Sequence, residues 1–124
     1  MAFRILVVDD NEQNRYVISR SLRHPDWIIE ECATGLQALE RVKSRPDLVI
    51  LDVRLPDMPG YEVCRRIKEA PLTRDIPVLQ VSAYAGEQGR AAARQAGADG
   101  FLSHPLEPDV LVDVVNSLLA HRKS

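Results

Sequence analysis

The sequence lacks the features that mark several large classes of protein. Its two cysteines, Cys32 and Cys64, do not have the spacing of a metal site, and two alone make a poor disulfide framework. We expect both to be small buried or half-buried apolar residues in a reducing cytoplasm. No apolar run approaches the ~20 residues that span a bilayer, and residues 1–4 lead directly into a short apolar strand rather than a signal peptide. We therefore expect a cytoplasmic protein without membrane contact.

An excess of positive charge and a glycine-rich nucleotide motif are also missing. The chain has 16 Lys and Arg against 18 Asp and Glu, a net charge of −2, so it has no general basic field for nucleic acid. No GxGxxG sequence occurs, which argues against a dinucleotide-binding domain. The 124 residues contain no internal repeat or linker, and 45% of them are hydrophobic. This predicts one globular domain over residues 1–124, with no direct contact to nucleic acid.

The most informative stretch that is present is Leu48-Val49-Ile50-Leu51-Asp52. Four branched apolar residues in a row suit a strand that is buried on both faces in the middle of a parallel sheet. The run ends on a carboxylate, and turn residues follow it as Leu55-Pro56-Asp57-Met58-Pro59-Gly60. In open α/β sheets, the carboxyl ends of the strands present the chemistry. Asp52 is therefore a candidate functional residue.

Other short apolar runs also end on polar side chains. They are Ile5–Val8 before Asp9 and Asp10, Val78–Val81 before Ser82, and Gly100–Ser103 before His104; a further strand, Trp27–Cys32, carries two glutamates that suit a sheet edge. A stretch with helical spacing follows each strand. The first runs to about Arg23 with Val17, Ile18, Ser21 and Leu22 inward, and the second follows Thr34 with Leu36, Leu39 and Val42 on one face. The others are Tyr61–Glu69, Glu87–Ala96 before Gly97, and Pro108 to about Arg122. Five strand–helix repeats predict a single α/β domain whose parallel sheet has helices on both faces.

Three carboxylates are expected to converge at one edge of this sheet. Asp9, Asp10 and Asp52 cannot all stay ionised there without a cation. A set of oxygen ligands without histidine or cysteine points to a hard ion such as Mg²⁺. Asp9 and Asp10 would equally suit the start of the following helix as capping acids.

This arrangement resembles the receiver domain of two-component response regulators, and the resemblance covers the whole chain. The matching motifs are Val7-Val8-Asp9-Asp10, Leu51-Asp52 with the Leu55–Gly60 turn, Val81-Ser82-Ala83, and Gly97-Ala98-Asp99-Gly100-Phe101 before His104-Pro105. The resemblance implies a doubly wound, flavodoxin-like (βα)5 fold with strand order 2-1-3-4-5. It also implies a phosphoprotein that catalyses only its own Mg²⁺-dependent phosphorylation and dephosphorylation and is otherwise no enzyme.

The resemblance assigns a role to each residue at the strand ends. Asp52 would accept a phosphoryl group from a histidine kinase or phosphotransfer domain. Asp10, Asp52 and the carbonyl of Arg54 would bind Mg²⁺ directly, and Asp9 would bind it through water. Ser82 would donate to the phosphoryl oxygens, Phe101 would swing inward when Ser82 moves, and Tyr84 would line the mouth of the site. Output would go to a downstream protein through the Glu87–Ala96 helix, the last strand and the last helix.

His104 departs from the family pattern, because a lysine ordinarily precedes this proline and pairs with the phosphoryl group. Receiver-like domains of multidomain sensor kinases also lack the lysine, so the chain is similar to a receiver from such a hybrid protein. We expect a cis His104–Pro105 bond and a phosphorylatable domain whose switch is weak. The alternative is a receiver-shaped interaction module that signals without phosphorylation; the loss of the lysine favours this hypothesis, whereas the intact acids and Ser82 oppose it.

Two further families of related chemistry fit less well. A flavin-binding protein of this topology would need a neutral loop after its first strand, whereas Asp9 and Asp10 would repel a phosphate. A haloacid-dehalogenase-type phosphatase would need a second acid two residues after Asp52, where Arg54 stands.

Overall fold

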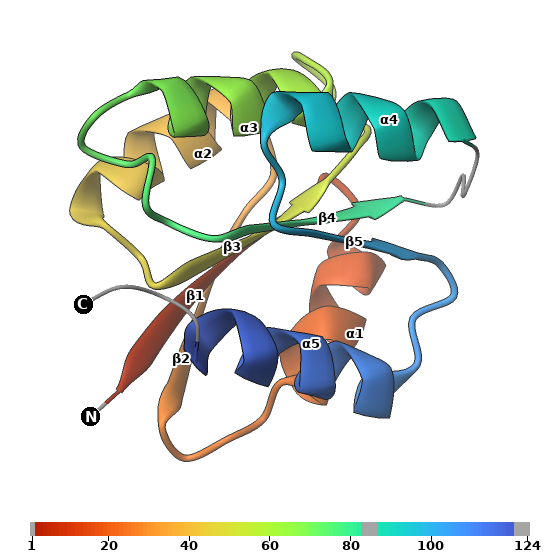
Figure 1. Cartoon of the computed structure of the whole chain (residues 1–124). Helices are drawn as coiled ribbons and strands as arrows, with labels where there is room; N and C mark the ends of the chain where they lie inside the picture. The colour runs from red at the N-terminus through yellow and green to blue at the C-terminus, as the bar shows by residue number, and fades with distance from the viewer. Residues whose placement is uncertain (1, 83–86, 121–124) are drawn as a thin grey trace.

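The computed structural model describes residues 2–82 and 87–120, in which five strands alternate with five α-helices (Figure 1). The strands are β1 Phe3–Val8, β2 Trp27–Cys32, β3 Leu48–Asp52, β4 Val78–Ser82 and β5 Gly100–Ser103. The helices are α1 Glu12–Ser21, α2 Gly35–Arg41, α3 Gly60–Glu69, α4 Glu87–Ala96 and α5 Pro108–Ala120, and a short 3-10 turn, η1 Val42–Ser44, extends α2. None of the described helices is long and apolar enough to cross a membrane.

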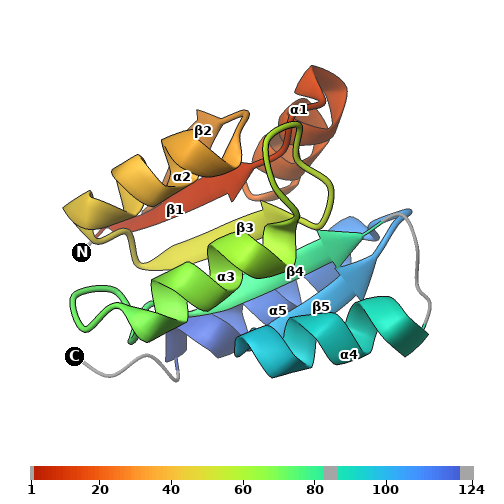
Figure 2. The same ribbon diagram turned by 90° about the horizontal axis from the view of Figure 1, so that it is seen from above.

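The five strands form one parallel sheet in the order β2-β1-β3-β4-β5, which confirms the predicted fold class and strand order. The strand β3 lies in the middle, and its four apolar residues are at most 1% exposed. Val8 at the end of β1 pairs with Leu51, and Val81 pairs with Asp52. All carboxyl ends of the strands therefore meet at one edge of the sheet (Figure 2).

Helices cover the sheet on both faces, with α2, α3 and α4 on one side and α1 and α5 on the other (Figures 1 and 2). A hydrophobic core lies on each face of the sheet. Because successive strand residues point to opposite faces, Leu6 and Leu51 belong to the core under α2, α3 and α4, and Ile5 and Ile50 belong to the core under α1 and α5. Each fully buried side chain of this size contributes roughly 1.5–3 kcal/mol. These two cores hold the strand ends in fixed positions.

Both cysteines are free and buried, as predicted from the sequence. Cys64 lies in α3 against the carbonyl oxygen of Ala96, with an Sγ–O distance of 3.6 Å. Burial raises the pKa of the Cys32 and Cys64 thiols to about 11. Both thiols therefore stay protonated at neutral pH and act as small apolar residues.

Two residues that we predicted on the inner faces of their helices are exposed. In each helix the face that packs on the sheet is narrower than the apolar spacing suggested. Val17 is 50% exposed, and the inner side of the first helix is formed by Ile18 and Leu22. Leu36 is 63% exposed. In α2 the buried residues are Gly35 and Ala38, and Gly35 packs closely against α3, which turns Leu36 to the outside.

The predicted helix ends are mostly confirmed. The first helix ends at Ser21, two residues before the predicted Arg23, and Gly97 follows α4 with a φ of +93°. The helix α5 begins at Pro108 as predicted, but its predicted end at Arg122 lies outside the described residues. The positive φ at Gly97 explains why a glycine ends α4.

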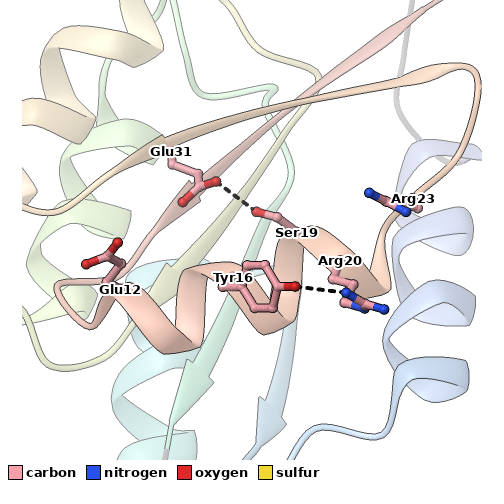
Figure 3. Close-up of a pocket in the computed structure, with 6 residues that line it drawn as sticks. All are labelled: Glu12, Tyr16, Ser19, Arg20, Arg23 and Glu31. Carbon is pink, nitrogen blue, oxygen red and sulfur yellow. Dashed lines mark hydrogen bonds between the residues drawn. The ribbon is translucent and has the colours of Figure 1, made fainter.

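The outer surface of α1 forms an open hollow of about 320 Å³ (Figure 3). The Arg20 guanidinium donates to the Tyr16 hydroxyl at 2.8 Å, and the Ser19 hydroxyl donates to the Glu31 carboxylate of β2 at 3.2 Å. Four of the polar side chains here are therefore paired, within α1 or between α1 and β2. The hollow is therefore a solvated helix face rather than our candidate site.

Candidate functional site

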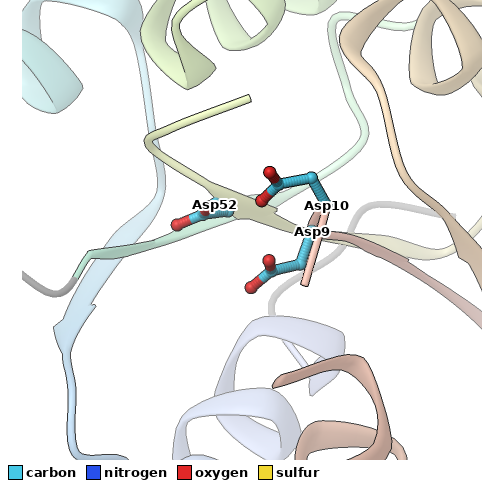
Figure 4. Close-up of side chains that lie close together, drawn as sticks. All are labelled: Asp9, Asp10 and Asp52. Atoms are coloured by element: carbon cyan, nitrogen blue, oxygen red, sulfur yellow. The ribbon is translucent and has the colours of Figure 1, made fainter. Parts of the chain in front are cut away.

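Three carboxylates meet at the carboxyl edge of the sheet, as predicted. Asp9 and Asp10 directly follow β1, and Asp52 is the last residue of the neighbouring β3. Because β1 and β3 are paired up to Val8 and Leu51, the acids that follow them lie side by side (Figure 4). Oxygen atoms of all three carboxylates lie within 4.8 Å of one another. Asp9 is buried, Asp52 is half-buried and Asp10 is exposed.

Burial and mutual repulsion change the electrostatics of this cluster. The pKa of Asp52 rises to about 7, first because the carboxyl is buried and then because Asp9 and Asp10 are close, while the backbone N–H groups of Arg54 and Val53 act in the opposite direction. Burial also raises the pKa of Asp9, although this carboxylate accepts the Asn11 N–H at 2.8 Å. A bound cation would relieve this repulsion and favour the ionised carboxylates.

The acids line an open cavity of about 360 Å³. The other side chains around it come from the start of α1, from the end of β4 and from the loops after β1, β3 and β5: Asn11, Asn14, Arg54, Leu55, Pro56, Ser82 and His104. Every residue that we assigned to metal binding or phosphoryl transfer therefore borders one cavity.

Ser82 and His104 are held at the edge of this cavity by the backbone. Ser82 ends β4 and is 3% exposed, and the His104 N–H donates to its carbonyl oxygen at 2.8 Å. The His104–Pro105 peptide bond is cis, which confirms the prediction. His104 Nε2 is buried and has no hydrogen-bond partner within the described part of the chain. A polar nitrogen thus stands unpaired beside the acids.

The loop after Asp52 depends on Gly60, which the sequence suggested only as turn material. The Gly60 N–H donates to the Val53 carbonyl at 2.7 Å, and Arg54 and Pro59 form a β-bridge. A Cβ atom at Gly60 would overlap the Asp52 carbonyl oxygen and lie 2.8 Å from the Val53 Cα. The absent side chain lets the start of α3 approach the backbone of Asp52.

Asp57 in the same loop has a structural role that was not predicted. Its carboxylate accepts the N–H groups of Gly35 and Leu36, each at 2.8 Å, at the start of α2. These bonds lower the pKa of Asp57, with the Gly35 bond as the largest cause. The contact joins residues more than 20 positions apart, so no local sequence signal could have revealed it.

Phe101 lies on β5 outside the acid cavity, half-buried, with the Arg90 guanidinium above its ring. The structure thus separates the proposed switch residue from the group of residues at the strand ends. Tyr84, which we expected at the mouth of the site, lies outside the described residues.

Comparisons with known proteins agree with this geometry. The family model for the response regulator receiver domain matches residues 5–116. The response regulator PleD of Caulobacter vibrioides is 37% identical over 119 residues, which are 95% of this chain and 26% of PleD. This chain thus spans about a quarter of that relative.

Solved structures show the same likeness. The signal receiver domain of a signal transduction histidine kinase from Syntrophus aciditrophicus has a TM-score of 0.89 and 31% identity, covering 99% of this chain and 96% of that one. The receiver domain of the sensor histidine kinase PA1611 from Pseudomonas aeruginosa has a TM-score of 0.88 and 29% identity, with 97% and 99% covered. That structure has a magnesium ion coordinated in its active site cleft.

Proposed function

The chain belongs to the response regulator receiver domain family, and from that premise we propose that Asp52 accepts a phosphoryl group from a histidine kinase or phosphotransfer domain. The observation that carries the proposal is the convergence of three carboxylates on one cavity that also holds Ser82. Members of this family are signalling domains rather than enzymes acting on separate substrates. Residues 1–124 would act as one such domain in the cytoplasm, and we expect no contact with membrane or nucleic acid.

In the proposed reaction, a carboxylate oxygen of Asp52 forms a bond to phosphorus. The phosphorus–nitrogen bond of the donor phosphohistidine breaks, and its electron pair leaves with the imidazole nitrogen, which then takes a proton. The product is an acyl phosphate on Asp52. Because only the ionised carboxyl is a nucleophile, the raised pKa of about 7 leaves Asp52 partly protonated at neutral pH, and a counter-charge would increase the reactive fraction.

The residues of the cavity fit Mg²⁺. Asp10, Asp52 and the carbonyl of Arg54 would hold the ion directly, and the buried Asp9 would hold it through water, a hard oxygen set of the kind this ion prefers. When bound, Mg²⁺ supplies positive charge that offsets the repulsion between carboxylates and phosphoryl group. Ser82 would donate its hydroxyl to a phosphoryl oxygen, and His104 would reach the same group only through water, because an imidazole is shorter than the usual lysine side chain.

The test is incubation with acetyl phosphate and Mg²⁺, followed by intact-protein mass spectrometry. We expect the wild type to gain the mass of one phosphoryl group and Asp52→Asn to gain none. The matched control is Asp75→Asn, because Asp75 is an exposed acid just before β4, at the opposite edge of the sheet. Equal labelling of wild type and Asp52→Asn would place the reaction elsewhere.

The second candidate function is a receiver-shaped interaction module that signals without phosphorylation. The replacement of the usual lysine by His104 favours it. Under this hypothesis the wild type gains no phosphoryl mass, although it binds its partner. In both cases we propose that output passes to a downstream protein through the surface of α4, β5 and α5.

A further inference from the structure

A cation from α4 covers the ring of Phe101. The guanidinium carbon of Arg90 lies 4.9 Å from the ring centroid, within the ~6 Å over which a cation is attracted to an aromatic face. Arg90 is exposed, whereas Phe101 is half-buried on the edge strand β5. The contact therefore ties α4 to the strand that leads into the acid cavity.

The strand β5 places Phe101 close to the reacting groups without exposing it to them. Ser103, two residues further along β5, pairs with Ser82, and His104 follows directly. The ring itself borders a second cavity of about 250 Å³, with Pro105 and Val110 on its other sides. A movement of Phe101 would thus be transmitted along three residues to the acid site.

The inner neighbour of Phe101 is polar. Gln80 on β4 pairs with Phe101 in register, so the two side chains share one face of the sheet. Gln80 is 1% exposed, and neither of its amide atoms has a hydrogen-bond partner in the described residues. On this face of the sheet the ring thus has a polar amide on its inner side and the Arg90 cation on its α4 side.

We propose that Arg90 is a positioning residue that holds Phe101 in its resting place and sets how much ligand at the acid site is needed to move it. The idea rests on the proposed function of that site. A cation–π contact at an exposed position favours the resting arrangement about two- to fivefold. While that arrangement predominates, loss of the contact lowers the ligand concentration at half-saturation by the same factor.

The experiment uses the fact that the chain contains only two phenylalanines, Phe3 and Phe101. Phenylalanine labelled with ¹³C in its ring gives two sets of NMR signals, and Phe3 on β1 serves as the internal control. Spectra are recorded for wild type, Arg90→Ala and Arg90→Lys, first without ligand and then during a beryllofluoride titration at saturating Mg²⁺. The matched control is Arg94→Ala, which removes an exposed arginine one turn further along α4.

We expect Arg90→Ala to shift the Phe101 signals without ligand and to lower the beryllofluoride midpoint about two- to fivefold. Arg90→Lys keeps a cation and should restore most of the wild-type midpoint. Arg94→Ala should leave both readouts unchanged. Melting temperatures are measured in parallel, because a merely structural loss would change stability without moving the midpoint.

Three results would overturn the proposal: unchanged Phe101 signals in Arg90→Ala, an unchanged midpoint, or an equal change in Arg94→Ala. If beryllofluoride binds none of the proteins, the proposed phosphoacceptor function is wrong, and so is the claim that Arg90 sets the ligand concentration needed to move Phe101. The holding contact is then decided by the ligand-free spectra alone. Unaltered Phe101 signals there would show that Arg90 holds nothing.

Discussion

At the scale of single residues, Asp52 makes stability depend on pH. Its pKa is about 7 in the folded protein, against 3.8 for an ordinary aspartate, so between these values the folded state binds a proton that the unfolded state lacks. Stability therefore increases as pH falls through the folded pKa and gains nothing more below the unfolded one.

We predict that in EDTA the melting temperature of the wild type rises relative to Asp52→Asn when the pH is lowered from about 8 to about 6. The asparagine cannot titrate, so the difference between the two proteins removes the contribution of the histidines. Thermal unfolding followed by circular dichroism measures it. Parallel pH profiles would show that Asp52 does not titrate in this range.

Gln80 leads to a second prediction at the residue scale. Its amide is buried with no hydrogen-bond partner in the described residues, and an unsatisfied buried group costs about 1–3 kcal/mol. Gln80→Met keeps the shape and removes the polar atoms, so we expect the free energy of unfolding to rise by about 1–2 kcal/mol. Urea denaturation provides the value, and Gln95→Met on the exposed side of α4 is the control. A decrease in Gln80→Met would show that the amide is satisfied.

At the scale of elements, the junction between β3 and α3 leaves no room for a side chain at Gly60. We predict that Gly60→Ala lowers the free energy of unfolding by about 1–3 kcal/mol, because its Cβ overlaps backbone atoms that cannot move away. Displacement of Asp52 should also reduce the stabilisation by Mg²⁺.

Gly35→Ala is the matched comparison for Gly60→Ala. Its Cβ would come 2.6 Å from the Met58 Cγ and 2.9 Å from the Val63 Cγ2, but both contacts are with side chains, which give way more readily than the backbone that faces Gly60. Urea denaturation with and without Mg²⁺ should therefore show a smaller loss and a normal Mg²⁺ response. Equal losses in both variants would remove the special role of Gly60.

The sequence predicted the elements well where the signal was local. Apolar runs marked each strand, and because parallel strands end together, the meeting of Asp52 with Asp9 and Asp10 followed from the order of elements alone. The predictions for Val17 and Leu36 were wrong because the inner face of a helix depends on what it packs against. The contacts of Asp57 with α2 and of Arg90 with Phe101 join separate elements, so neither composition nor spacing could predict them.

At the scale of the whole molecule, the acid site should couple metal binding to stability. An ion that binds only the folded state stabilises it by mass action, by about 2.7 kcal/mol at a concentration one hundred times its Kd. We predict that Mg²⁺ raises the melting temperature of the wild type and of Asp75→Asn.

In Asp10→Ala the response to Mg²⁺ should vanish. The metal-free variant should also melt higher than the metal-free wild type, because one of three crowded carboxylates is gone. Differential scanning calorimetry compares the wild type and Asp10→Ala, each with EDTA and with Mg²⁺. An undiminished Mg²⁺ response in Asp10→Ala would mean that the ion binds elsewhere.

The two hydrogen bonds from α2 to Asp57 give the site a remote reporter. The amide protons of Gly35 and Leu36 exchange when their hydrogen bonds to Asp57 open, and Asp57 lies in the loop that also contains Arg54, a proposed metal ligand. Binding that steadies this loop should slow hydrogen–deuterium exchange at the two amides, although neither residue borders the acid cavity. Their exchange rates would then record occupancy of the site from the far side of the loop, in a protein that carries no probe at all.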